Sequence, residues 1–282
     1  MRLTVVGSGP AAPQPDTAAS GHLVETDEAA ILLDCGYGVM SRLRTMIDPL
    51  ALDGVVIGHF HADHFLDLAA LRYVHPWPGS DEDRPEVWLP GGGRQRLAGL
   101  AAMMSERQTF FEDAFDIHEY ESEQVFTIGD LTIRPSRMHH YVPAWAMTII
   151  DGEGARLVYG GDTGPHDQFM RVARDADLLI AEATLASADE DELNRGHCTA
   201  EEALIMAREA NVRRVVLTHY PSARRPALTE IADQAPMPTM IAKPGVEVDI
   251  GPAALPVLDD MAIPEPAPSR AFPGRPDVSR AV

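Results

Sequence analysis

A histidine–aspartate cluster carries the strongest chemical signal in this sequence. From His59 to His64 the pattern H-x-H-x-D-H places four ligand-type side chains within six residues. Neutral imidazole nitrogens and carboxylate oxygens are ligands that divalent metal ions such as zinc prefer. His59 and His61 point the same way on an extended backbone, whereas Asp63 and His64 lie past the turn. We therefore expect two metal ions, each bound by one of these pairs.

Three further segments supply candidate ligands, and each directly follows a predicted strand. They contain the adjacent pair His139 and His140, then Asp162, and then His219. Strand ends at the mouth of a sheet are where functional sites are usually built. Two divalent ions lower the pKa of a water between them and neutralise charge that grows on a phosphoryl oxygen. The residues therefore predict a metal-dependent hydrolase.

The elements that must position these residues are mostly short apolar strands separated by turn residues. Two β-rich halves each end in helices, which predicts two packed sheets with helices outside, an αββα layering. Thr199 and Glu202 form a capping-box pattern at the start of one helix. The predicted strands are 3–6, 22–25, 31–34, 54–58, 87–90, 125–128, 131–135, 145–150, 156–159, 177–181 and 215–218, and the predicted helices are 36–45, 93–104, 168–174 and 199–210.

The composition of the chain changes near residue 250. Beyond this point proline, alanine and arginine dominate, with five prolines between Pro264 and Pro276. Such a composition buries too little apolar surface to offset the entropy of ordering. We predict one catalytic domain over residues 1–251 and a poorly ordered tail over residues 252–282.

Charge and cysteine content narrow the class of protein. The 282 residues carry 23 Lys and Arg against 43 Asp and Glu, a formal charge of −20. Proteins that grip long nucleic acids carry basic stripes, so this balance disfavours them. Cys35 and Cys198 cannot build a disulfide scaffold, and no segment approaches the ~18 apolar residues of a membrane span. We expect a cytoplasmic protein without a membrane partner.

These motifs resemble those of the metallo-β-lactamase-fold hydrolases. Within that family they are most similar to the ribonuclease Z-like branch and its relatives that act as cyclic nucleotide phosphodiesterases. The resemblance extends from Met1 to about Gly251 and implies a four-layer αββα fold with two packed mixed β-sheets. The segments that carry it are 7–9, 32–36, 59–64, 161–164, 181–184, 196–200 and 217–219.

The resemblance implies a role for each candidate ligand. It assigns two divalent ions, with Zn²⁺ first and Mn²⁺ or Fe²⁺ as alternatives, because the nitrogen and oxygen ligands suit each. At the third motif His140 fits the spacing to Val142 and Pro143, and His139 is the alternative. The implied ligands are His59, His61 and His140 for the first ion, Asp63, His64 and His219 for the second, and Asp162 as a bridge between them.

The same resemblance implies Asp63, Glu182 and His197 as catalytic residues. Glu182 and His197 resemble an acid pair in which the carboxylate orients a histidine near the leaving group. A neighbouring carboxylate raises the pKa of an imidazole and keeps it protonated near neutral pH, as a general acid requires. The alternative is structural: Glu182 satisfies a backbone turn and His197 precedes the Thr199 cap.

The expected substrate follows from the absence of the tRNA-binding arm that is typical of ribonuclease Z. Members of that branch usually carry a long tRNA-binding arm, which in bacteria lies between the third-motif histidine and the bridging aspartate. Here His140 and Asp162 are only 22 positions apart, so no arm fits. We expect a phosphodiesterase that attacks a small or cyclic nucleotide with metal-activated water, and the resemblance suggests a homodimer. The alternatives are an arm-less ribonuclease Z-type endoribonuclease for tRNA 3′ processing and a metal-dependent ester or lactone hydrolase.

Overall fold

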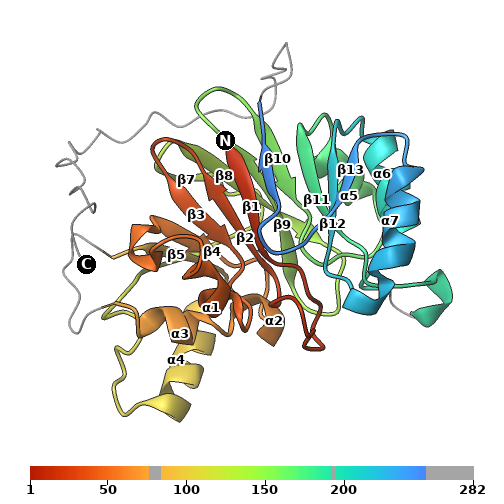
Figure 1. Cartoon of the computed structure of the whole chain (residues 1–282). Helices are drawn as coiled ribbons and strands as arrows, with labels where there is room; N and C mark the ends of the chain where they lie inside the picture. Colours follow the sequence, from red (N-terminus) through yellow and green to blue (C-terminus); the bar gives the residue numbers. More distant parts are fainter. Residues whose placement is uncertain (76–83, 192–194, 252–282) are drawn as a thin grey trace, which may run out of the picture.

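Two seven-stranded β-sheets pack against each other and carry helices on their outer faces (Figure 1). The computed structural model describes residues 1–75, 84–191 and 195–251. This arrangement confirms the αββα fold expected from the sequence. The predicted tail at 252–282 lies outside the described residues, so a domain boundary at residue 251 stays a prediction.

The first sheet has the strand order β14-β1-β2-β3-β4-β5-β6. Its pairs are antiparallel from β14 to β3 and parallel from β3 to β6. Because β14 pairs with β1, residues near 248 complete the sheet that residue 2 begins. The bounds are β1 Arg2–Gly7, β2 Gly21–Glu25, β3 Ala30–Leu33, β4 Gly54–Val56, β5 Glu86–Pro90, β6 Asp116–Tyr120 and β14 Glu247–Asp249.

The second sheet has the order β13-β12-β11-β10-β9-β8-β7. Its pairs are antiparallel from β7 to β10 and parallel from β10 to β13. The carboxyl ends of its parallel strands therefore meet at one edge. The bounds are β7 Phe126–Ile128, β8 Leu131–Met138, β9 Ala144–Ile150, β10 Arg156–Tyr159, β11 Leu178–Glu182, β12 Val215–Thr218 and β13 Thr239–Ile241.

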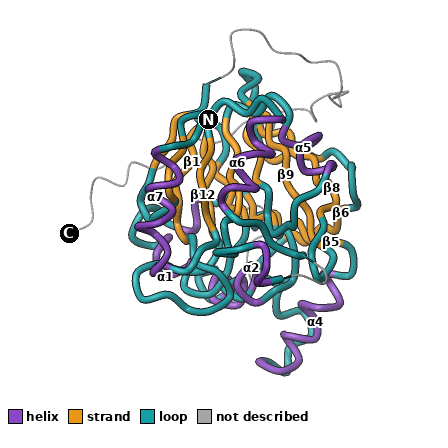
Figure 2. Tube along the Cα trace, turned by 90° about the vertical axis from the view of Figure 1, so that its right-hand side faces the viewer, coloured by secondary structure: helices purple, strands orange, loops and turns teal. Residues whose placement is uncertain are grey.

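Helices cover the outer face of each sheet. Figure 2 shows α5, α6 and α7 in front of the second sheet, and α1 and α4 contact the first sheet. Among the described residues, no helix has the length and apolar character needed to cross a membrane. The helices are α1 Val39–Leu43, α2 Ala62–Phe65, α3 Leu68–Arg72, α4 Gly93–Met104, α5 Asp167–Ala173, α6 Ala200–Glu209 and α7 Arg225–Asp233.

Alternating apolar residues build the layers between these elements. Successive side chains of a strand point to opposite faces of its sheet. In β3, Ile31 and Leu33 join the core between the two sheets, whereas Leu32 joins the core beneath α1, α3 and α4. The first sheet therefore packs apolar residues on both of its faces.

The structure departs from the predicted elements in a few places. β8 continues to Met138, beyond the predicted end at residue 135, because Met138 pairs with Ala144 in β9. The short helices α2 and α3 and the elements β6, α7, β13 and β14 were not among those predicted. β4 ends at Val56, so the residues from Ile57 to His61 form a connection into α2.

Candidate metal-binding site

Loops and helix starts at one edge of the two sheets bring the predicted ligands together. The ligand atoms form two groups, and within each group they lie within 4.8 Å of one another. His59 and His61 follow β4, Asp63 and His64 lie in α2, His140 follows β8, Asp162 follows β10, and His219 follows β12. All seven predicted ligands therefore lie at this edge.

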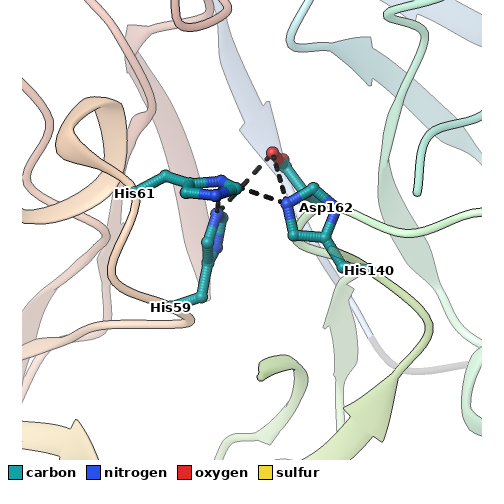
Figure 3. A group of neighbouring side chains, drawn as sticks. All are labelled: His59, His61, His140 and Asp162. Atoms are coloured by element: carbon teal, nitrogen blue, oxygen red, sulfur yellow. Dashed lines mark hydrogen bonds and ion pairs between the residues drawn. The ribbon is translucent and has the colours of Figure 1, made fainter. Parts of the chain in front are cut away.

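The first group consists of His59, His61, His140 and Asp162 (Figure 3). His61 Nδ1 lies 3.0 Å from His59 Nε2 and 3.1 Å from His140 Nε2. Asp162 Oδ2 lies 3.8 Å from His59 Nε2 and 3.9 Å from His140 Nε2. Three imidazole nitrogens and one carboxylate oxygen thus converge on one point, the donor set of a divalent metal ion.

The second group consists of Asp63, His64, Asp162 and His219, all of them buried. His219 Nε2 lies 3.1 Å from Asp63 Oδ2 and 3.4 Å from Asp162 Oδ2. His64 Nε2 lies 3.4 Å and 3.3 Å from the same two oxygens. Asp162 Oδ2 therefore belongs to both groups, in the position that the resemblance assigns to a bridge.

Hydrogen bonds to the far ring nitrogens suit two of the histidines for metal binding. His64 Nδ1 donates to Asp34 Oδ2 at 2.6 Å, and His140 Nδ1 donates to the Gly196 carbonyl at 2.7 Å. A neutral imidazole that donates from Nδ1 keeps a lone pair on Nε2. Each of these histidines can therefore bind a metal ion through Nε2.

The second group needs positive charge. His64 Nε2 is buried and makes no hydrogen bond with any described residue, although it faces the carboxylates of Asp63 and Asp162. Burial lowers the pKa of His64, but the Asp162 and Asp34 carboxylates outweigh it and hold that pKa well above its usual range. A metal ion at this position would take the place of the Nε2 proton and neutralise the two carboxylates, so these residues fit a metal ion.

Asp34 supports the second group through hydrogen bonds, and the sequence analysis assigned no role to this residue. Its Oδ2 accepts hydrogen bonds from His64 Nδ1 and, at 2.5 Å, from the Tyr159 hydroxyl, and its Oδ1 accepts from Gly58 N at 2.7 Å. Asp34 is fully buried and has a φ of 58°. An acidic residue directly after an apolar strand was the available signal.

We expect Asp34→Asn to lower the affinity for divalent metal by about 10- to 100-fold, as loss of a partner to a metal-binding histidine does. Asparagine tolerates the positive φ, so the fold is retained. A competition titration with a chelator measures the affinity. The control is Asp177→Asn, an equally buried carboxylate that bonds Arg156 N and Arg213 away from the site. Equal affinity in Asp34→Asn and the wild type would contradict this role.

Glu182 and His197 lie beside both groups. Glu182 Oε1 is 2.8 Å from His197 Nδ1 and accepts a hydrogen bond of 2.8 Å from Thr163 N. The His197 ring stacks on the His219 ring at 5.5 Å and lies 4.9 Å from that of His140. Burial lowers the pKa of His197, but the Glu182 carboxylate outweighs it and raises that pKa to about 9. His197 thus carries a proton at neutral pH when no metal ion is bound.

Glu182, His197 and His219 are also close enough to form a third group of possible metal ligands. Within it, Glu182 Oε1 and His197 Nδ1 are hydrogen-bonded to each other. His219 turns its Nε2 toward Asp63, in the second group. The atoms of this third group are therefore already engaged, and the pair is better suited to proton transfer.

Thr184 connects this pair to the second group. Its hydroxyl donates to Glu182 Oε2 and lies 2.8 Å from His219 Nδ1, which donates to it when Nε2 is unprotonated. A single carboxylate thus orients His197 directly and His219 through one hydroxyl. Thr184 is a second residue that the sequence left without a role.

The remaining histidines lie outside the two groups. The ring of His139, the alternative third-motif ligand, lies 6.2 Å from that of His166. His22 is buried beneath the site, where its ring lies 5.2 Å from Tyr159 and its Nε2 lies 3.3 Å from Thr218 Oγ1. The structure therefore brings His140, and not His139, to the other ligand-type residues.

Known proteins share this fold and parts of this sequence. The protein named probable metallo-hydrolase YhfI, from Bacillus subtilis, is 32% identical over 225 residues, which cover 78% of this chain and 87% of YhfI. Its crystal structure superposes with a TM-score of 0.77 at 28% identity, covering 88% of this chain and 99% of that one. Ribonuclease Z from Ignicoccus hospitalis is 27% identical over 283 residues, covering 83% of this chain and 92% of its own.

A more distant solved structure agrees in fold alone. Unliganded PDE1 from yeast superposes with a TM-score of 0.69 at 13% identity, covering 87% of this chain and 98% of that one. The model of the β-lactamase superfamily domain matches residues 29–220, which is more than half of the chain. The protein therefore belongs to the β-lactamase superfamily, as its motifs from His59 to His219 led us to expect.

Proposed function

We propose that this protein is a phosphodiesterase that uses two divalent metal ions to hydrolyse a small or cyclic nucleotide phosphodiester. The observation that carries the proposal is the Glu182–His197 pair beside two ligand groups that share Asp162 Oδ2. Hydrolysis of a diester needs an attacking water on one side of phosphorus and a proton donor for the leaving oxygen on the other. The site holds residues suited to both requirements.

The ligand residues prepare the attacking side. Divalent ions, Zn²⁺ in the first place, would supply Lewis acidity there by lowering the pKa of water and neutralising charge on a phosphoryl oxygen. The shared carboxylate of Asp162 would hold the two ligand groups at a fixed separation. Asp34 and Gly196 keep the rings of His64 and His140 in place through their Nδ1 atoms. The residues that would hold the ions are His59, His61, His140, Asp63, His64, His219 and Asp162.

His197 prepares the leaving side. Because its Nδ1 is bonded to Glu182, the remaining nitrogen, Nε2, is the atom that gives a proton to the departing alkoxide. Thr163 N and the Thr184 hydroxyl hold the two oxygens of Glu182, so the imidazole keeps one orientation. The negative charge of Glu182 stabilises the imidazolium before the proton is transferred.

The connection between His140 and Asp162 supports a small substrate. The 22 positions from His140 to Asp162 are occupied by β9 and β10, which are consecutive strands of the second sheet. No extended arm emerges there to grip a large RNA. The formal charge of −20 also opposes binding of a long polyanion, whereas a small anion is attracted locally by bound metal.

A second candidate is an arm-less ribonuclease Z-type endonuclease. It is favoured by the 27% identity to the ribonuclease Z of Ignicoccus hospitalis. Both candidates use the same ligand groups and the same acid pair, so only the substrate separates them.

We expect the metal-loaded protein to cleave cyclic AMP and bis-p-nitrophenyl phosphate with a weak dependence on salt concentration. A small diester releases few counterions on binding, whereas a tRNA contact through several phosphates weakens steeply as salt rises. The measurement is kcat/KM at increasing salt for a panel of these two diesters, a precursor tRNA and a lactone, with metal analysis of the same sample.

Two outcomes of this panel would redirect the proposal. Tight, steeply salt-dependent binding of precursor tRNA without hydrolysis of cyclic nucleotides would favour the endonuclease. Rapid cleavage of the lactone without hydrolysis of any diester would contradict both phosphodiester functions.

A further inference from the structure

An exposed aromatic side chain stands at the edge of the metal-binding site. Tyr141 directly follows His140 and leaves 47% of its surface exposed, although His140 itself is buried. Its ring lies 4.9 Å from the His140 ring and 5.5 Å from that of His197, measured between centroids. What sets Tyr141 apart is that its partly exposed ring lies beside the acid pair, where an aromatic surface can contact a substrate.

Neighbouring groups hold the Tyr141 ring in a single place. Its hydroxyl donates to the carboxylate of Asp191, which also accepts a 2.9 Å hydrogen bond from Gly196 N. The ring fills the space that a side chain at residue 196 would need, because a Cβ on Gly196 would lie 2.7 Å from ring atoms of Tyr141. The hydroxyl is thus engaged within the protein, and the exposed part of the side chain is an immobilised ring.

The position of the Tyr141 ring relative to His197 determines which part of a substrate can contact the ring. The His197 ring has both the Tyr141 ring and the His219 ring as neighbours, at 5.5 Å from each. If His197 protonates the leaving oxygen, the part of the substrate beyond that oxygen extends past His197 toward Tyr141. A rigid aromatic surface loses little entropy when a flat ring stacks on it.

We propose that Tyr141 is a specificity-determining residue whose ring stacks on the base of a nucleotide substrate. This inference rests on the proposed phosphodiesterase function and narrows it to diesters that carry a nucleobase. In a 3′,5′-cyclic nucleotide the base is attached to the same sugar as the leaving oxygen, so the two fit this arrangement. Stacking of this kind accepts different bases, because each base has a π-face.

The test compares two substrates that differ only in the base. They are cyclic AMP and 1-O-methylribose 3′,5′-cyclic phosphate, which keeps the sugar and the diester. In Tyr141→Leu the ratio of kcat/KM for cyclic AMP to that for the base-less ester falls by about 5- to 150-fold, mainly through KM. Tyr141→Phe keeps the ring and most of the ratio. Tyr73→Leu, which removes another exposed tyrosine (65% exposed), leaves the ratio unchanged.

A binding measurement makes the test independent of turnover. Calorimetry compares AMP with ribose 5-phosphate, and Tyr141→Leu should weaken AMP binding alone, with the metal content of the protein unchanged. Equal losses on both substrates would show that the ring only positions His140 or His197, and unchanged ratios would show that it touches no base. If the wild type hydrolyses neither ester, the phosphodiesterase proposal fails, and the binding ratio still decides the role of Tyr141.

Discussion

Asp162→Ala is expected to lose at least one metal ion per chain and almost all hydrolytic activity. The Oδ2 atom of Asp162 lies between 3.3 and 3.9 Å from the ring nitrogens of four histidines in the two groups. Without it, both groups lose their common negative charge while their imidazoles remain buried together. The loss of activity should exceed the roughly 10- to 100-fold that follows removal of a partner to a ligand.

Elemental analysis and steady-state kinetics on one preparation measure this effect. The matched control is Asp177→Ala, which removes another almost fully buried carboxylate, just before β11 and away from the ligand groups. Its loss weakens the hydrogen bonds to Arg156 N and Arg213 and lowers stability, but metal content should stay at the wild-type level. Full metal content together with full activity in Asp162→Ala would overturn the assignment.

His197→Ala is expected to keep both metal ions and the fold, yet to lower turnover of a diester with a poor leaving group by about 10²- to 10⁴-fold. An alkoxide leaves slowly unless it is protonated, and His197 Nε2 is the proposed donor. p-Nitrophenolate hardly needs protonation, so the loss on bis-p-nitrophenyl phosphate should be much smaller. The measurement is the ratio of the two losses in the same variant.

Glu182→Gln provides the graded comparison. The amide can still bond to His197 Nδ1 but no longer supplies the negative charge that favours the imidazolium. The variant should therefore show the same leaving-group pattern with a smaller loss. Equal losses on good and poor leaving groups, or loss of metal from His197→Ala, would identify His197 as a ligand or a structural residue instead.

Local patterns were sufficient to predict the helices α4 and α6. α4 spans Gly93–Met104 as predicted, and α6 begins one residue after Thr199, whose capping box with Glu202 is present. β14 was missed because only Val248 of its three residues is apolar and buried. It is a strand because β1 pairs with it across the sequence. Tertiary pairing of this kind leaves little trace in a short polar segment.

The same distinction between local patterns and long-range contacts applies to the residues of the site. The H-x-H-x-D-H pattern is local, so the sequence identified its ligand-type residues directly. The spacing to Val142 and Pro143 favoured His140 over His139, but the carbonyl that orients His140 belongs to Gly196, 56 positions further along, and left no local signal. Thr184 was overlooked for the same reason, since its partner His219 lies 35 positions further along. Residues that act through distant partners become visible only when the chain is folded.

The pairing of β14 with β1 sets the order in which the chain can fold during translation. A ribosome adds about 5 to 20 residues per second, so residues 247–249 emerge about 10 to 50 s after β1. Until then β1 pairs with β2 on one side and presents an open edge on the other. Gly245 and Val246, which bond to the backbone of Val5, arrive equally late. Through most of its synthesis, the nascent chain therefore exposes a strand edge with which another strand can pair. Slow translation prolongs this exposure and increases the risk of aggregation.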